Sequence, residues 1–136
     1  MGAWGTGIFD NDTACDWIYD LEETNDLSLI ESTLDKVLDA GAKYLEAPDA
    51  EEALAAAEAV VRLKGNWGIR NSYTETLDKW VKITGLVPTQ GLIEKALKVI
   101  ERVTSGPSEL LELWGESDEF TAWEESVRDL LKRLKA

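Results

Sequence analysis

Apolar residues recur every three or four positions along most of the chain, which is the spacing that places them on one face of a helix. Ser, Thr, Asp, Pro and Gly, the residues that start and stop helices, separate these stripes from one another. The pattern predicts a first helix that starts at Asp10 or Asp12. Further helices are predicted at about 27–40, 48–64, 72–85, 89–104, 107–114 and 117–135. No alternating apolar and polar run between turn residues predicts a strand.

We therefore expect an all-α fold, a compact bundle of about six or seven helices in a single domain over residues 1–136. The alanine-rich helix at about 48–64 is expected to be central, because small side chains let neighbouring helices pack closely. Glu58 and Arg62 are one helical turn apart in this segment and are expected to pair on its outside.

An extended glycine-rich segment precedes the first predicted helix. Its glycines are expected to let the chain lie flat against the helices, while Trp4 and Phe9 fill apolar pockets and Asp10 caps the helix. Trp17 and Trp123 lie on apolar faces and are expected in the core. The spacing of the glycines matches neither a dinucleotide-binding loop nor a Walker loop.

The expected surface is strongly acidic, since the net charge is −13. Asp12, Asp16 and Asp20 stand four residues apart on the first predicted helix, and no basic residue occurs before Lys36. Salt bridges from other helices, or simple solvation, would be an ordinary explanation of this face. A face that binds a partner is the alternative, and these three residues are candidates for it.

Two further candidates for partner contact are Trp67 and Trp114. Trp67 stands in a glycine-rich loop and Trp114 near a helix end, so neither is committed to an apolar face. Exposed tryptophan is enriched at the centres of protein interfaces.

Composition excludes several classes of chemistry. The chain has no histidine, so it lacks the Ser-His and Cys-His pairs, the usual zinc ligands and the Glu-x-x-His di-iron motif. We predict no catalytic, metal-binding or cofactor-binding residues. A single cysteine, Cys15, cannot form an intrachain disulfide, and no apolar run is long enough to span a bilayer. A cytoplasmic protein that binds neither membranes nor nucleic acid is expected, because the acidic balance disfavours phosphate contacts.

The first twelve residues, Met-Gly-Ala-Trp-Gly-Thr-Gly-Ile-Phe-Asp-Asn-Asp, resemble the hallmark of a bacterial family described as domain of unknown function 4259. The likeness continues through Tyr-Leu-Glu-Ala-Pro-Asp-Ala-Glu-Glu-Ala-Leu-Ala-Ala-Ala-Glu at 44–58 and Ser-Glu-Leu-Leu-Glu-Leu-Trp at 108–114, and is weakest at about 65–86. The resemblance implies a stand-alone cytoplasmic protein of bacterial origin and carries no established activity.

The small size of the protein, its acidic composition and its expected stand-alone nature favour a non-enzymatic module that binds a basic protein partner. An immunity-type or antitoxin-like inhibitor would be such a module. An enzyme that works through carboxylates, with or without a divalent metal, is the first alternative. A self-associating structural protein is the second.

Overall fold

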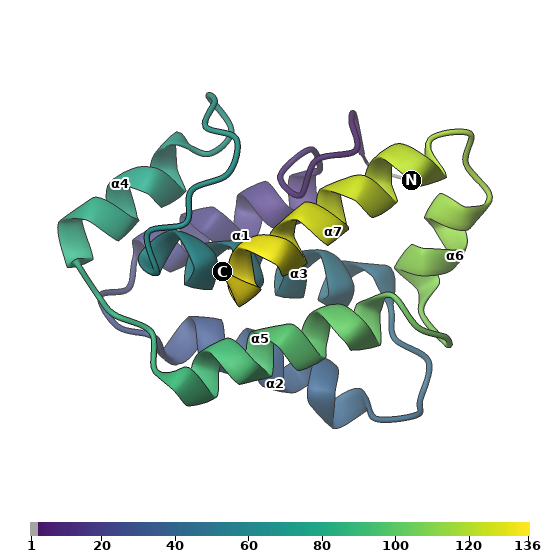
Figure 1. Cartoon of the computed structure of the whole chain (residues 1–136), viewed down its shortest axis with the longest axis horizontal. Helices are drawn as coiled ribbons and strands as arrows, with labels where there is room; N and C mark the ends of the chain where they lie inside the picture. Colours follow the sequence, from purple (N-terminus) through teal and green to yellow (C-terminus); the bar gives the residue numbers. More distant parts are fainter. Residues whose placement is uncertain (1–2) are drawn as a thin grey trace.

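The alanine-rich helix α3 (Ala47–Leu63) is the centre of the molecule and packs against every other helix. The computed structural model describes residues 3–136, and Figure 1 shows α7 crossing α3 on one side while α2 and α5 lie together on another. Most of the alanines of α3 are fully buried. The prediction of a central, closely packed helix is therefore confirmed.

The all-α fold is also confirmed, because residues 3–136 contain helices and only two isolated β-bridges. No helix in this part of the chain combines the length and apolar character that a membrane span requires. The elements surrounding α3 are α1 (Asp12–Glu22), α2 (Ser28–Ala40), α4 (Glu75–Thr84), α5 (Gln90–Val103), α6 (Glu109–Gly115) and α7 (Phe120–Lys135).

The first helix is capped by Asn11, so the prediction that Asp10 caps it is wrong. The Asn11 side chain accepts a hydrogen bond from the amide of Ala14 at 2.8 Å. The Asp10 carboxylate instead turns back and accepts from the amide of Gly7 at 2.9 Å. Asp12 is already the first residue of the helix.

The aromatic residues divide between the core and the surface. Phe9, Trp17 and Trp123 are buried as expected, and the indole of Trp17 donates to the Thr33 hydroxyl at 2.9 Å. Trp4 is a correction, because 48% of it is exposed and its ring lies 5.3 Å from the ring of Tyr73. Trp4 therefore fills no pocket in the core.

The Glu58–Arg62 pair is buried, which corrects the expectation that it lies outside. Only 1% of Glu58 and 2% of Arg62 are exposed, because helices surround α3 on every side. Arg62 donates from Nη1 to Asp78 of α4 at 2.7 Å and from Nη2 to the carbonyl of Ile69 at 2.7 Å. Its Nε lies 3.4 Å from Glu58. The core thus contains charged groups that would be unstable there without their partners.

Replacing Arg62 with alanine should lower the free energy of unfolding by about 3–5 kcal/mol, because Glu58 and Asp78 would stay buried without this partner. Arg128→Ala is the matched control, since Arg128 forms an exposed pair with Glu124 and should cost about 1 kcal/mol or less. Urea denaturation measures both variants. Equal losses in the two would show that burial of the network adds nothing.

Candidate functional site

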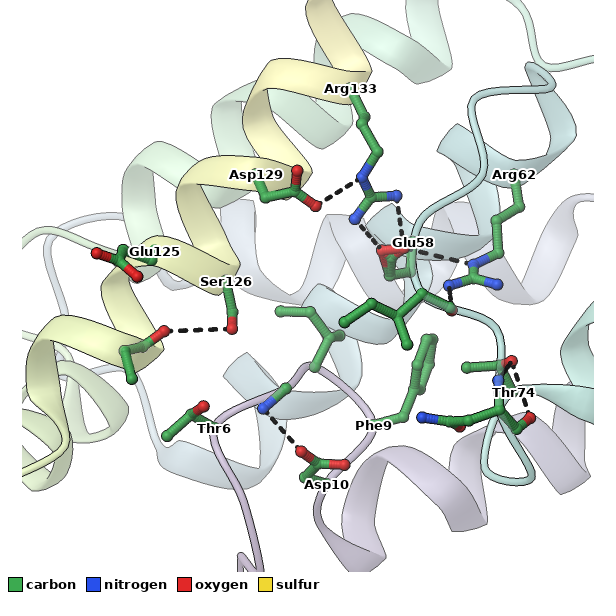
Figure 2. A pocket seen from close by; sticks show the side chains of 15 residues that line it. Thr6, Phe9, Asp10, Glu58, Arg62, Thr74, Glu125, Ser126, Asp129 and Arg133 are labelled. Carbon is green, nitrogen blue, oxygen red and sulfur yellow. Dashed lines mark hydrogen bonds and ion pairs between the residues drawn. The ribbon is translucent and has the colours of Figure 1, made fainter.

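A pocket of about 430 Å³ opens where the N-terminal segment, α3, the α3–α4 loop (64–74) and α7 meet (Figure 2). This volume is within the range of sites that bind small ligands. The residues that line it are Thr6, Gly7, Ile8, Phe9 and Asp10 of the N-terminal segment, Glu58 and Arg62 of α3, Ile69, Asn71 and Thr74 of the loop, and Ala122, Glu125, Ser126, Asp129 and Arg133 of α7.

The floor of the pocket is an ion network centred on Glu58. Arg133 of α7 donates to both carboxylate oxygens of Glu58, from Nη1 at 2.8 Å and from Nη2 at 2.9 Å. The Nε of Arg133 donates to Asp129 at 2.8 Å. The forked contact between Arg133 and Glu58 is the strongest geometry available to an arginine and a carboxylate. The network therefore ties α7 to α3 directly beneath the pocket.

The network extends to α4 through Asp78. One carboxylate oxygen of Asp78 accepts from Arg62, while the other accepts from the Thr74 hydroxyl at 3.0 Å and lies 3.4 Å from Nε of Arg70. Three arginines thus face three carboxylates: Arg62, Arg70 and Arg133 against Glu58, Asp78 and Asp129. The network as a whole is electrically balanced, although its members Arg70 and Asp78 lie outside the lining of this pocket.

Three glycines make room for the charged side chains around the pocket. A Cβ on Gly5 or Gly7 would lie 2.5 or 2.8 Å from Oδ2 of Asp10, and a Cβ on Gly68 would lie 2.7 Å from Cζ of Arg133. Contacts this short force a neighbour to move. The N-terminal glycines are therefore needed because the chain folds around the Asp10 carboxylate, rather than only to lie flat.

Two carboxylates at the pocket stand outside the balanced network. Asp10 accepts only from the amide of Gly7, and Glu125 on α7 is exposed and has no hydrogen bond or ion pair to any residue in the range 3–136. The apolar part of the lining comes mainly from Ile8, Phe9 and Ile69. The pocket consequently combines apolar walls with uncompensated negative charge.

The acidic residues of the first helix lie on its solvent side. Asp12, Asp16 and Asp20 are exposed, and none of them forms a salt bridge within the described part of the chain. Tyr19 lies among them with 60% of its surface exposed. Burial raises the pKa of the Cys15 thiol, and the nearby charges of Asp12, Asp16 and Asp10 raise it further. The exposed carboxylates thus create a negative electrostatic potential around this helix.

The two tryptophans predicted to contact a partner take different positions. Trp114 is a correction, because only 5% of it is exposed and it stacks on Trp123 with 6.0 Å between ring centroids. The short helix α6 places it against α7, which removes it from the surface. Trp67 is half-buried, with the guanidinium of Arg70 4.7 Å above its ring.

Sequence reasoning found the acidic helix face but missed the pocket. Glu58 and Arg62 sit in a run that is otherwise almost entirely alanine and valine, and this setting was the available signal that both are buried. Nothing local indicated Arg133 as their partner. Among residues 3–136, no three His, Cys, Asp or Glu side chains are grouped so that they could hold a metal ion.

Gly5→Ala should destabilise the protein by about 1–3 kcal/mol, because the added methyl group would displace the Asp10 carboxylate. In an Asp10→Ala background the same substitution should cost much less, since the obstructing carboxylate is gone. Gly91→Ala is the control, because its Cβ would meet only Thr89 at 3.9 Å. Thermal unfolding of the four variants of the cycle gives the coupling, and its absence would contradict the packing described.

The pKa of the Cys15 thiol can be used to measure the electrostatic potential around α1. The double substitution of Asp12 and Asp16 by asparagine should lower the pKa of Cys15, because two of the charges that oppose its ionisation are removed. Alkylation by iodoacetamide, which requires the thiolate, should then reach half its maximal rate at lower pH. The double variant Glu94→Gln with Asp118→Asn, at two exposed positions on other elements, controls for the change in net charge. An unchanged pH midpoint would show that the aspartates exert no such field.

One comparison with known proteins supports the family that the sequence resembles. The model of the family described as domain of unknown function (DUF4259) matches residues 2–126. No curated protein and no solved structure matches the chain. The matched range contains the N-terminal segment, Glu58 and Arg62, while Asp129 and Arg133 lie beyond it, and Met1 and Gly2 of the motif lie outside the described residues. Because the match covers most of its length, the chain belongs to the DUF4259 family.

Proposed function

We propose that this protein is a non-enzymatic binding module that docks a basic protein partner on the α1 face, by which we mean Asp12, Asp16, Tyr19, Asp20 and Glu23. The observation that carries the proposal is that these carboxylates are exposed and have no basic partner within residues 3–136. Some acidic residues on other helices do have a basic partner. Lys95, for example, lies 3.2 Å from Glu31 and 2.7 Å from Asp35.

The position of Tyr19 supports a role in contact rather than in solubility alone. Tyr19 lies three residues after Asp16 and four before Glu23, so it belongs to the same side of the helix as the carboxylates. An exposed tyrosine supplies apolar area and a hydroxyl at small entropic cost, as contact residues of interfaces often do. A partner would place its lysine or arginine side chains around this ring.

The net charge of −13 supports the same partner class. A strongly acidic protein attracts basic proteins over distances comparable with the Debye length, and the rate of association falls as salt is added. An immunity-type or antitoxin-like inhibitor is the specific form of module that this arrangement would suit. The corresponding partner would be an enzyme or toxin with a basic surface.

The enzyme alternative receives less support from the pocket. A catalytic carboxylate must be free to exchange protons or bind substrate, yet both oxygens of Glu58 are held by Arg133. Asp129 and Asp78 are likewise held by arginines. Glu58 and Asp129, the two carboxylates of the pocket lining that belong to the ion network, are therefore committed to arginines.

Affinity capture from lysate of the native host tests the proposal. The immobilised protein should retain a basic protein at low salt and release it as salt increases, because exposed charge pairs are screened. The triple variant with asparagine at Asp12, Asp16 and Asp20, and separately Tyr19→Ala, should retain at least about tenfold less of it.

The matched control neutralises Glu94, Glu101 and Asp118, which are exposed on other helices or loops. It changes the net charge by the same amount and should retain the partner fully. Equal retention by the triple variant, or recovery of no protein that salt elutes, would refute the proposal.

A further inference from the structure

The floor of the pocket carries hydrogen-bond donors that have no acceptor in the range 3–136. A guanidinium group has five N–H hydrogens in one plane. Arg62 donates three of them, to Glu58, Asp78 and the carbonyl of Ile69, so one hydrogen on Nη1 and one on Nη2 have no partner there. Only 2% of Arg62 is exposed, and a buried donor without an acceptor is costly. Because Arg62 lines the pocket, an acceptor bound in the pocket can remove this cost.

Arg133 carries a further unused donor next to the same carboxylate. It donates from Nε to Asp129, from Nη1 to Glu58 and to the carbonyl of Asn66, and from Nη2 to Glu58. The second hydrogen of Nη2 has no acceptor within the described residues. Both guanidinium groups contact Oε1 of Glu58, and Figure 2 shows Arg62 and Arg133 reaching this carboxylate from different sides. The unused donors therefore belong to two neighbouring groups that both line the pocket.

An anion does not suit these donors. Glu58, Asp78 and Asp129 already pair with the two arginines, so the positive charge of the arginines is neutralised. An incoming carboxylate or phosphate would have to displace Glu58 from Arg133, which is strongly unfavourable for a buried carboxylate. The arginines thus offer N–H groups without net charge. An uncharged oxygen atom can accept from these groups and leave the ion pairs intact.

A cation does not suit the floor either, because an ammonium or amidinium group has N–H donors of its own and no acceptor. The two carboxylates of the lining that lie outside the ion network do not provide a site for it. Asp10 accepts from the amide of Gly7, and Figure 2 shows Glu125 directed away from the pocket. Any attraction of a cation to these two partly exposed groups is screened by salt.

The pocket also offers apolar surface to a ligand. Ile8, Phe9 and Ile69 line it, and 77% of Ile69 is exposed although its side chain is large and apolar. The volume of about 430 Å³ exceeds what a few water molecules require and is within the range of sites for small organic molecules. A ligand with an apolar body would cover this surface.

We propose that this pocket binds a small uncharged organic molecule that has a carbonyl oxygen on an apolar body. The oxygen accepts hydrogen bonds from the unused N–H groups of Arg62 and Arg133, and the apolar body lies on Ile8, Phe9 and Ile69. The residues of the α1 face take no part in this site, so the proposed function and this ligand site can each fail without the other.

Titration of the ¹⁵N-labelled protein with three planar probes of one shape tests the proposal. Benzamide is uncharged and has a carbonyl oxygen, benzoate is an anion, and benzamidinium is a cation without an oxygen. At about 0.5 M sodium chloride, which screens attraction between exposed charges, benzamide should shift the amide signals of Gly7 and Ser126 in a saturable way. Its affinity should be at least about tenfold higher than that of either charged probe.

Ile69→Ala should weaken benzamide binding by about threefold to tenfold, because it removes apolar surface that the ring covers. Ile83→Ala is the matched control, since 83% of Ile83 is exposed but Ile83 is not part of the lining. Both variants should keep the melting temperature of the parent, because both side chains are exposed. Benzoate or benzamidinium binding as tightly as benzamide, equal affinities in the two variants, or no saturable shift up to about 10 mM benzamide would overturn the proposal.

Discussion

A buried carboxylate, that of Glu58, is the constraint on which the rest of this structure depends. An ionised group in a protein interior must be paired and hydrogen-bonded. Arg62 reaches only Oε1 of Glu58, so Oε2 has a partner only because α7 brings Arg133 against α3. Arg62 in turn requires Asp78, which fixes α4, and the carbonyl of Ile69, which draws the α3–α4 loop across the network. The same constraint explains why residue 68 is glycine, because a side chain there would collide with Arg133.

The helices could be predicted from the sequence, and their partners could not. Each helix carries its own apolar stripe, so spacing alone places it to within a few residues, and the alanine content of α3 marked it as central. The spacing of Glu58 and Arg62 showed that they meet, but not on which side. That depends on Asp78 and Arg133, which lie 16 and 75 residues from the groups they bind.

The α1 face and the pocket also differ in how far each could be predicted from the sequence. The α1 face is a repeat of four residues on one helix, so it is visible in the sequence before any tertiary contact is known. The pocket is lined by elements from opposite ends of the chain, and the charges of Glu58 and Asp129 in its lining are balanced by Arg62 of α3 and Arg133 of α7. The glycine-spaced N-terminus was visible as a motif, yet its physical reason, the space that the Asp10 carboxylate occupies, needed the fold.

Native-state hydrogen exchange in an Arg133→Lys variant tests most directly whether the network holds the α3–α4 loop and α7 on α3. Lysine keeps the charge but loses the fork that engages both oxygens of Glu58. The account predicts faster exchange, through local opening, for amides in residues 64–74 and in the C-terminal half of α7, with the amides of α2 and α5 unchanged. Unchanged exchange in residues 64–74, or the same acceleration in every helix, would contradict it.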